Sequence, residues 1–256
     1  MGKKYNRSKR KYKKYSNNKF LNGVVIILLV LFGYFFAEEK IDLEDLFNQN
    51  SRIERESKES FDMDSIPEFS GEPYIVLNSN VPEFTEDEKR DSEPSEFYSE
   101  LDELGRVGVA EGVLGIETMP TEKRGSIGSV KPTGWHTIKY DNIKGKYLYN
   151  RCHLIGYQLS AENANKRNLM TGTRYFNVDG MLPFENLVAD YIKETNNHVR
   201  YRVTPIFKGN NLLAHGLQME AYSIEDMGEG ISFNIYCYNN QPGIKINYVD
   251  GSSEKE

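Results

Sequence analysis

The sequence predicts an α+β domain with a central, mainly antiparallel sheet and flanking helices, preceded by one N-terminal transmembrane helix. Three observations predict it. An uncharged apolar segment lies near the N-terminus, most later apolar stretches have the composition or alternation of strands, and one segment shows the periodicity of an amphipathic helix. The 256 residues are enough for one substantial domain and additional segments.

The N-terminal region combines a basic tail with an apolar segment. Residues 1–19 hold nine Lys or Arg and no acidic residue, and residues 20–37, FLNGVVIILLVLFGYFFA, carry no charge. This segment has 18 residues, which is near the minimum length for a helix that spans about 30 Å of hydrocarbon. Because the basic flank comes first, the N-terminus is expected in the cytoplasm. The sequence therefore predicts a single-pass anchor in the cell membrane with the C-terminal domain extracellular.

A cleaved signal peptide is the main alternative, because it also places an apolar region after basic residues. The apolar region is long for such a peptide, and residues 35–37, Phe-Phe-Ala, lack a small residue at the −3 position. A secreted form is therefore less expected than an anchored one. A buried helix of a soluble domain would seldom follow such a basic run.

Residues 38–70 are rich in Glu, Asp, Ser and Lys and are expected to form an acidic, solvated tether before a domain at residues 71–252. Without the nine basic residues of the tail, 23 of the 32 remain against 38 acidic residues, which gives the rest of the chain a net charge of −15. Cys152 and Cys237 are too few for a disulfide framework. The sequence leaves open whether these two cysteines form one disulfide bridge or stay as two free thiols.

The elements of the domain follow from local patterns. The helix expected at residues 92–105 has Ser95 as its cap and Gly105 as its stop. Residues 119–135 are rich in turn formers and predict a long loop. Residues 162–180 are expected as a helix followed by a loop. The apolar spacing of residues 181–197 predicts an amphipathic helix. Strands are expected at residues 73–78, 107–115, 146–156, 198–207, 211–224 and 231–239.

The middle of the domain is basic. Residues 121–208 hold 14 Lys or Arg and seven Asp or Glu, a balance that suits a polyanionic partner. Arg200 and Arg202 share one face of a strand, and the residues between and beside them share the other. We expect these two arginines to contact nucleic acid, with an ordinary solvated face as the open alternative.

His153 ends a strand, and a polar, asparagine-rich segment follows it. Asn168 and Asn177 are nine residues apart, and Glu185 follows eight residues later in the first turn of the amphipathic helix. Neutral histidine accepts a proton near pH 7, and oxygen ligands suit Mg²⁺. The set favours phosphodiester hydrolysis. A core histidine, turn-forming asparagines and a glutamate that favours the helix dipole are the structural alternatives.

The segments YNRCHLIG, NLMTGTRYFN and GMLPFEN resemble the motifs of the DNA/RNA non-specific endonucleases, the ββα-metal nucleases. The segments LDELGRVGVAEGVLG, MPTEKRGSIGSVKPTGW and QPGIKINYVDGSS resemble the streptococcal-type membrane nucleases, which include the DNA-entry nuclease of transformation. The resemblance extends over residues 73–252, with the motifs in the same order.

The resemblance implies a ββα-metal nuclease fold, an Mg²⁺ ion with Mn²⁺ as a substitute, and a set of site residues. His153 would be the general base and Asn177 the direct metal ligand. Asn168 would help to hold the site, Glu185 would bind a metal-coordinated water, and Arg151 would contact phosphate. Arg167 and Arg174 are further candidates for nucleic-acid contacts.

The family motif Asp-Arg-Gly-His here reads Asn150-Arg151-Cys152-His153. Loss of the carboxylate at Asn150 raises the question of what orients the His153 ring, and a backbone carbonyl would suffice. Cys152 in place of glycine implies a slightly different turn and removes no catalytic group.

We therefore expect a membrane-anchored, extracellular, sugar-non-specific endonuclease that acts on DNA and RNA. The alternative is a non-catalytic cell-surface module that binds nucleic acid, which only the changes at Asn150 and Cys152 favour. A hydrolase for another substrate on the same scaffold has no support in the sequence.

Overall fold

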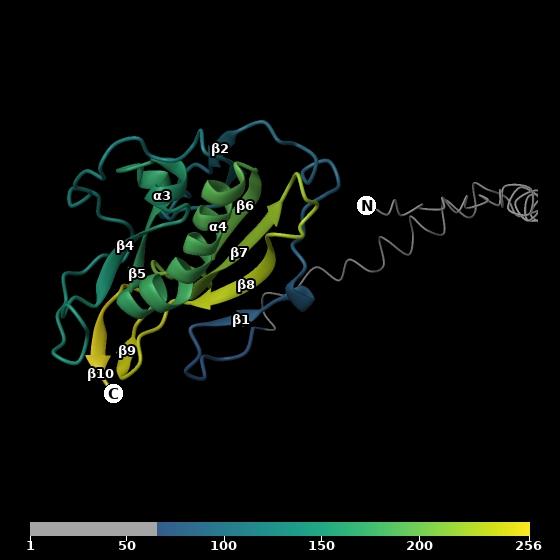
Figure 1. Ribbon diagram of the computed structural model, residues 1–256. Helices are drawn as coiled ribbons and strands as arrows, with labels where there is room; N and C mark the ends of the chain where they lie inside the picture. Colours follow the sequence, from purple (N-terminus) through teal and green to yellow (C-terminus); the bar gives the residue numbers. More distant parts are fainter. Residues whose placement is uncertain (1–65) are drawn as a thin grey trace, which may run out of the picture. The chain divides into compact units, whose positions relative to one another are not determined.

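The computed structural model of the protein describes residues 66–256 (Figure 1). The expected basic tail, the expected transmembrane segment at residues 20–37 and most of the expected tether lie outside the described residues. Between residues 66 and 256, no helix has both the length and the apolar character needed to cross a membrane.

A six-stranded antiparallel sheet forms the centre of the domain, in the order β1-β8-β7-β6-β3-β2. Its longest strands are neighbours, and Tyr201 at the middle of β6 lies opposite Ala221 of β7 and Gly112 of β3. The strands are β1 (Tyr74–Val76), β2 (Ser95–Tyr98), β3 (Ala110–Leu114), β6 (Val199–Ile206), β7 (Gly216–Ser223) and β8 (Ser232–Tyr238).

A separate antiparallel pair carries the sequence motifs. Strand β4 (Tyr149–His153) pairs with β5 (Leu169–Thr173), and the chain then passes through a π-helical turn, η4 (Phe176–Met181), into helix α4 (Leu182–Thr195). This succession of two strands and a helix is the β-β-α unit that the resemblance implies. The short elements are η2 (Asn78–Asn80), α3 (Tyr157–Ser160), η3 (Lys166–Asn168), β9 (Ile244–Ile246) and β10 (Ser253–Lys255).

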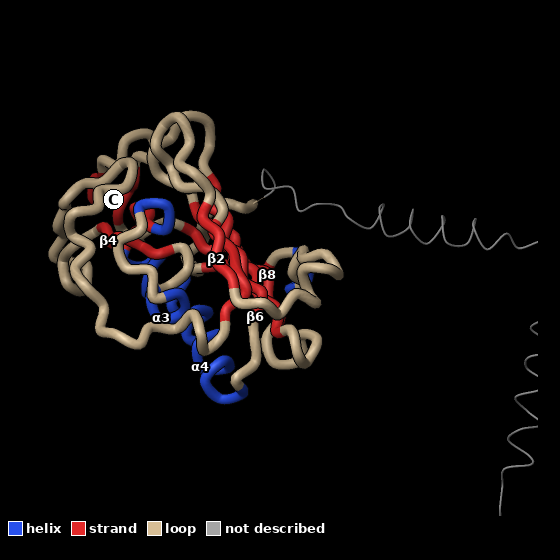
Figure 2. The backbone as a smooth tube through the Cα atoms, turned by 90° about the horizontal axis from the view of Figure 1, so that it is seen from above, coloured by secondary structure: helices blue, strands red, loops and turns tan. Residues whose placement is uncertain are grey.

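Helix α4 packs against the central sheet and fixes the position of the β-β-α unit. Figure 2 shows α3 and α4 on the same side of the sheet. Val188 and Ile192 of α4 are fully buried in one core cluster with Val199 and Tyr201 of β6. Burial of each such aliphatic side chain stabilises the fold by about 1.5–3 kcal/mol. The helix ends at Asn196, whose left-handed conformation closes its last turn.

The structure confirms the mainly antiparallel sheet, the loop at residues 119–135, the helix at residues 181–197 and a strand within each of the six expected stretches. The helix expected at residues 92–105 is wrong. Its first part forms edge strand β2, because pairing of Ser95–Tyr98 with β3 outweighs the local helix signals.

The expected helix and loop at residues 162–180 are also wrong, because this stretch contains β5. Every residue of β5 is buried, so the stretch lacks the alternation that marks a half-buried strand.

Cys152 and Cys237 are both buried and form no disulfide, so both are free thiols.

Candidate active site

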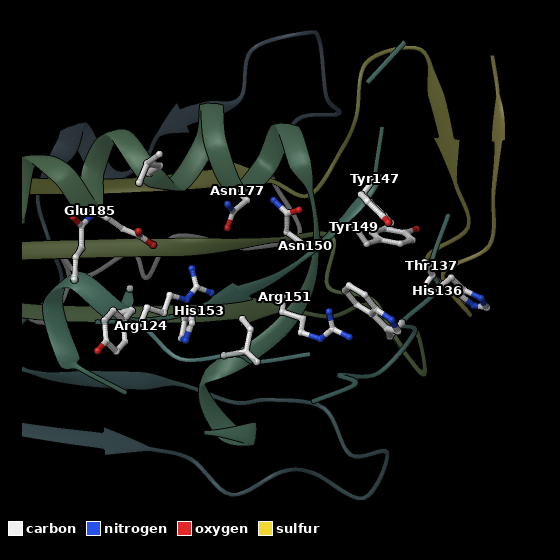
Figure 3. A pocket seen from close by; sticks show the side chains of 16 residues that line it. Arg124, His136, Thr137, Tyr147, Tyr149, Asn150, Arg151, His153, Asn177 and Glu185 are labelled. Carbon is white, nitrogen blue, oxygen red and sulfur yellow. The ribbon is translucent and has the colours of Figure 1, made fainter. Parts of the chain in front are cut away.

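One cavity of about 760 Å³ brings together four of the nine predicted site residues, and it is called the main cavity below (Figure 3). Arg151, His153, Asn177 and Glu185 line it. They come from β4, η4 and the first turn of α4, so the β-β-α unit builds one wall. The sequence separates these residues by up to 34 positions, and the pairing of β4 with β5 closes that gap.

His153 is the last residue of β4, and only 7% of it is exposed. Its Nε2 lies 2.8 Å from the backbone oxygen of Asn163. A carbonyl oxygen can only accept, so Nε2 is the donor and the neutral ring keeps its lone pair on Nδ1. Burial lowers the pKa of His153, while the Asn163 carbonyl opposes that effect. The ring is therefore a neutral base near pH 7, oriented by a backbone carbonyl.

Asn168 holds the backbone that follows His153. Its side chain is fully buried, and its Oδ1 accepts a hydrogen bond from the Ile155 amide at 2.9 Å while its Nδ2 donates to the Ile155 carbonyl at 3.0 Å. A third bond runs from the Leu154 amide to the Asn168 carbonyl at 2.9 Å. Asn168 does not line the main cavity, so the structure makes it a positioning residue.

Glu185 lies in the first turn of α4 and points into the main cavity (Figure 3). Burial raises the pKa of its carboxyl to about 7, and the Arg124 guanidinium opposes the shift. Gly156 makes room for this carboxylate, because a Cβ at position 156 would lie 2.7 Å from Glu185 Oε2. Because a nearby positive charge favours the ionised form, a cation bound in the main cavity would offset the cost of ionising this carboxyl.

Asn177 belongs to the π-helical turn, where the Leu182 amide bonds to the Asn177 carbonyl. Single π-helical turns inside helices are frequent at functional sites. Figure 3 shows the Asn177 side chain next to that of Asn150 from β4, with both reaching into the main cavity. The residue that departs from the family motif therefore still presents an amide to the site.

Arg151 lines the main cavity but is tied to the loop of residues 119–135. Its Nε donates to the Val130 carbonyl, and its Nη2 donates to the Gly128 carbonyl at 3.0 Å. The guanidinium also stacks on Trp135, 3.9 Å from the ring centroid. Two of its three nitrogens thus hold the loop, and Nη1 has no hydrogen bond to the residues that the structure describes.

Arg124 joins the site from the same loop, and the sequence reasoning missed it. It lines the main cavity, and Figure 3 shows its side chain reaching towards His153. Its charge acts on both neighbours, since it lowers the pKa of Glu185 and of His153. The sequence showed only that Arg124 is a basic residue in a loop that resembles the family. Nothing in the local sequence distinguishes Arg124 from its neighbour Lys123.

The other predicted arginines lie outside the main cavity. Arg200 Nη2 pairs with Glu111 at 3.0 Å and Glu88 at 3.3 Å, while Arg202 Nε pairs with Glu220 at 2.9 Å. The prediction that these two bind nucleic acid finds no support, because acidic side chains already compensate their charges on the face of the sheet away from α4.

Arg167 and Arg174 also lie outside the lining of the main cavity. Arg167 pairs with Glu100 at 2.5 Å. Arg174 follows β5 and lies against Gly145. A role for either in binding nucleic acid stays a prediction.

The donors in the main cavity fit a hard divalent cation. Asn150, Asn177 and Glu185 offer amide and carboxylate oxygens, which are the ligands that Mg²⁺ prefers. Among residues 66–256, no group of three or more His, Cys, Asp or Glu side chains forms a metal-binding cluster. A cation here would therefore have few direct protein ligands and keep several waters.

Comparison with known proteins agrees with this geometry. A sequence model described as DNA/RNA non-specific endonuclease matches residues 86–225, which include β4, β5 and α4. No curated protein gave a significant match.

Solved structures share the fold. NucA from Streptococcus agalactiae with a bound magnesium ion is 23% identical, with 73% of this chain and 91% of that chain covered and a TM-score of 0.62. The same protein without metal is 22% identical, with coverages of 76% and 92% and a TM-score of 0.64. The Sda1 nuclease with a bound zinc ion is 25% identical, with coverages of 72% and 97% and a TM-score of 0.59. The chain belongs to the DNA/RNA non-specific endonuclease family and is a nuclease.

Proposed function

We propose that this nuclease is an endonuclease that cuts internal phosphodiester bonds of DNA and RNA. His153 is the general base, and a divalent cation, expected to be Mg²⁺, binds beside Asn177 and Glu185. One observation carries the proposal. The His153 ring is held by the Asn163 carbonyl in the same cavity as Asn177, Glu185 and the predicted phosphate contact Arg151.

His153 supplies the base. With the proton on Nε2 directed at Asn163, Nδ1 takes a proton from an attacking water. The lowered pKa keeps the ring neutral at physiological pH, so a base is available there. A positioned general base of this kind contributes about 10² to 10⁴ in rate.

Arg124 and Arg151 supply positive charge. Both line the main cavity, and a guanidinium is a strong donor to phosphate oxygens. Contacts directed at phosphate carry no information about the base or the sugar. A site built on such contacts is expected to act on both DNA and RNA.

The cation, when bound, neutralises charge on the phosphoryl oxygens as phosphodiester cleavage proceeds. Asn177 would be its direct ligand, and Glu185 would bind a water in its shell. Support comes from the oxygen donors of the main cavity and from the magnesium and zinc ions in the NucA and Sda1 structures. Mn²⁺, which takes similar oxygen ligands, is expected to replace Mg²⁺.

We propose that the enzyme is anchored in the cell membrane by residues 20–37 and acts outside the cell. The support is the uncharged segment after a basic tail. Protease added to intact cells should remove the domain and leave a short membrane-held fragment. A soluble, mature protein beginning near residue 38 would contradict the anchor.

A module that binds nucleic acid without cutting it rests only on the departures at Asn150 and Cys152. Cys152 is fully buried, so its thiol adds nothing to the main cavity. Asn150 still lines the cavity, and the Asn163 carbonyl orients His153. Neither departure removes the base.

The test is cleavage of circular plasmid and of RNA by the purified protein in Mg²⁺, in Mn²⁺ and in chelator. The proposal expects internal cuts in both substrates with either ion, no cuts in chelator, and loss of cutting in Asn177→Ala with nucleic-acid binding retained. Undiminished cleavage in chelator would remove the cation from the mechanism. Absence of cleavage in Mg²⁺, with binding intact, would favour the binding module.

A further inference from the structure

The main cavity has an aromatic end beyond its hydrolytic residues. Trp135, Tyr147 and Tyr149 line this end. Figure 3 shows Tyr147 and Tyr149 on the side of Asn150 that lies away from His153 and Glu185. Tyr149 is buried, and its hydroxyl donates to the Gly251 carbonyl at 2.9 Å. Trp135 is half-buried, and the Arg151 guanidinium lies over its ring. Tyr147 differs from both, because 47% of it is exposed at the cavity.

A rigid hairpin presents Tyr147. Lys139 and Tyr147 form a β-bridge, and the Leu148 amide donates to the Ile138 carbonyl at 3.0 Å. Ile143 at the tip and Leu148 at the base are buried in a second core cluster with residues of β4 and β9. A large exposed ring on an anchored hairpin loses little conformational freedom when a ligand stacks on it.

The charge around Tyr147 is positive. Residues 139–147 hold three lysines and one aspartate. Lys146 pairs with Asp141 at 3.1 Å, while Lys139 Nζ lies over the Tyr147 ring, 4.6 Å from its centroid. The Arg174 guanidinium lies near Gly145 of the same hairpin, 4.0 Å from where a Cβ at position 145 would stand. An aromatic surface surrounded by cations suits the base and the phosphate of a nucleotide.

We propose that the aromatic end of the main cavity is a nucleotide subsite, in which an unpaired base stacks on Tyr147 while Lys139 contacts the adjacent phosphate. The subsite rests on the proposed function, since it holds the strand whose phosphodiester bond is cut at His153. A base inside a duplex is already stacked and must be freed first. The subsite therefore makes single-stranded DNA or RNA the preferred substrate class.

Binding to a short single strand tests the subsite apart from cleavage. The full chain carrying His153→Ala, in detergent and chelator, is titrated into fluorescent oligothymidylate and into the same strand with every base removed. Loss of one stacking contact is expected to weaken binding about five- to 150-fold. The parent should therefore prefer the strand with bases by that factor, and adding Tyr147→Ala should abolish the preference.

Two further variants make the comparison specific. Tyr147→Phe keeps the ring and should keep the preference. Phe97→Ala, at an aromatic residue that is 56% exposed on β2 and absent from the cavity lining, should change nothing. Because Tyr147 is exposed, its substitution should leave the melting temperature within a few degrees of the parent.

The outcomes separate the two proposals. If the wild-type enzyme cuts in Mg²⁺ but the strands with and without bases bind equally, or the preference survives Tyr147→Ala, the subsite is refuted and the proposed function stands. If the preference depends on Tyr147 but no cleavage occurs, the subsite stands on a protein that only binds nucleic acid.

Discussion

Replacing Glu185 with glutamine should stabilise the metal-free protein above neutral pH while removing its activity. Burial raises the pKa of this carboxyl to about 7, against an ordinary value of 4.5. The folded state therefore holds the proton more tightly than the unfolded chain. This favours folding below pH 4.5, and the contribution is lost as the pH rises to about 7. Glutamine has the shape of the protonated acid and no such dependence.

The size of the effect follows from that difference. At about 1.4 kcal/mol for each pH unit, the gap between 4.5 and about 7 amounts to at most about 3 kcal/mol at pH 8. For a domain of this size, the melting temperature of Glu185→Gln should exceed that of the wild type by up to about 10 °C. Near pH 4.5 the two proteins should melt together.

The melting temperatures of both proteins are measured by calorimetry in chelator, from about pH 4.5 to about pH 8. Asp190→Asn is the matched control, because it removes one negative charge from an exposed position of the same helix. Added Mg²⁺ should stabilise the wild type more than Glu185→Gln. A stability difference that is the same at pH 5 and about pH 8, or a less stable glutamine variant at the higher pH, would refute the reasoning.

The remaining predictions concern residues around His153. Because burial lowers the pKa of His153, the acid limb of kcat/KM, measured in saturating Mg²⁺ so that Glu185 stays ionised, should have its midpoint below pH 6.5, and a midpoint above 7 would contradict a buried neutral base. Gly156→Ala should fold normally, since its φ of −56° suits alanine, yet lose activity as its Cβ displaces Glu185, measured as kcat beside the melting temperature. Asn168→Ala should destabilise the protein by about 2–4 kcal/mol in urea unfolding, because both backbone groups of Ile155 lose their partner, whereas a change under 0.5 kcal/mol would deny that role.

Local patterns in the sequence were sufficient for the parts of the site that depend on single elements. The strand that ends at His153 is indicated by the aromatic, strand-like composition of its segment, and the helix that holds Glu185 is indicated by its apolar spacing. Strand β5 does not, because it is buried on both faces and its partner β4 lies 16 residues before it. The pairing of β5 with β4 brings Asn168 to the backbone of Ile155, which its side chain hydrogen-bonds.

Contacts between distant segments could not be predicted in this way. The shared face of Arg200 and Arg202 follows from strand alternation, whereas their partners Glu88 and Glu220 are set by packing. Arg124 reaches the cavity because its loop folds over β4, which no local pattern specifies. The acceptor for His153 is a backbone oxygen, and a backbone oxygen has no signature in the sequence.

Chemical rescue of His153→Ala tests the central claim most directly. The variant should stay folded at the assay temperature, as its melting curve checks, lose at least about 10² of the rate of plasmid cleavage in Mg²⁺, and regain part of it as imidazole is added. Imidazole would act there as the missing base, so the rescued rate should fall as the pH drops below the imidazole pKa. Full activity in His153→Ala, or a loss that tracks the unfolded fraction and does not respond to imidazole, would contradict the assignment of His153 as the base.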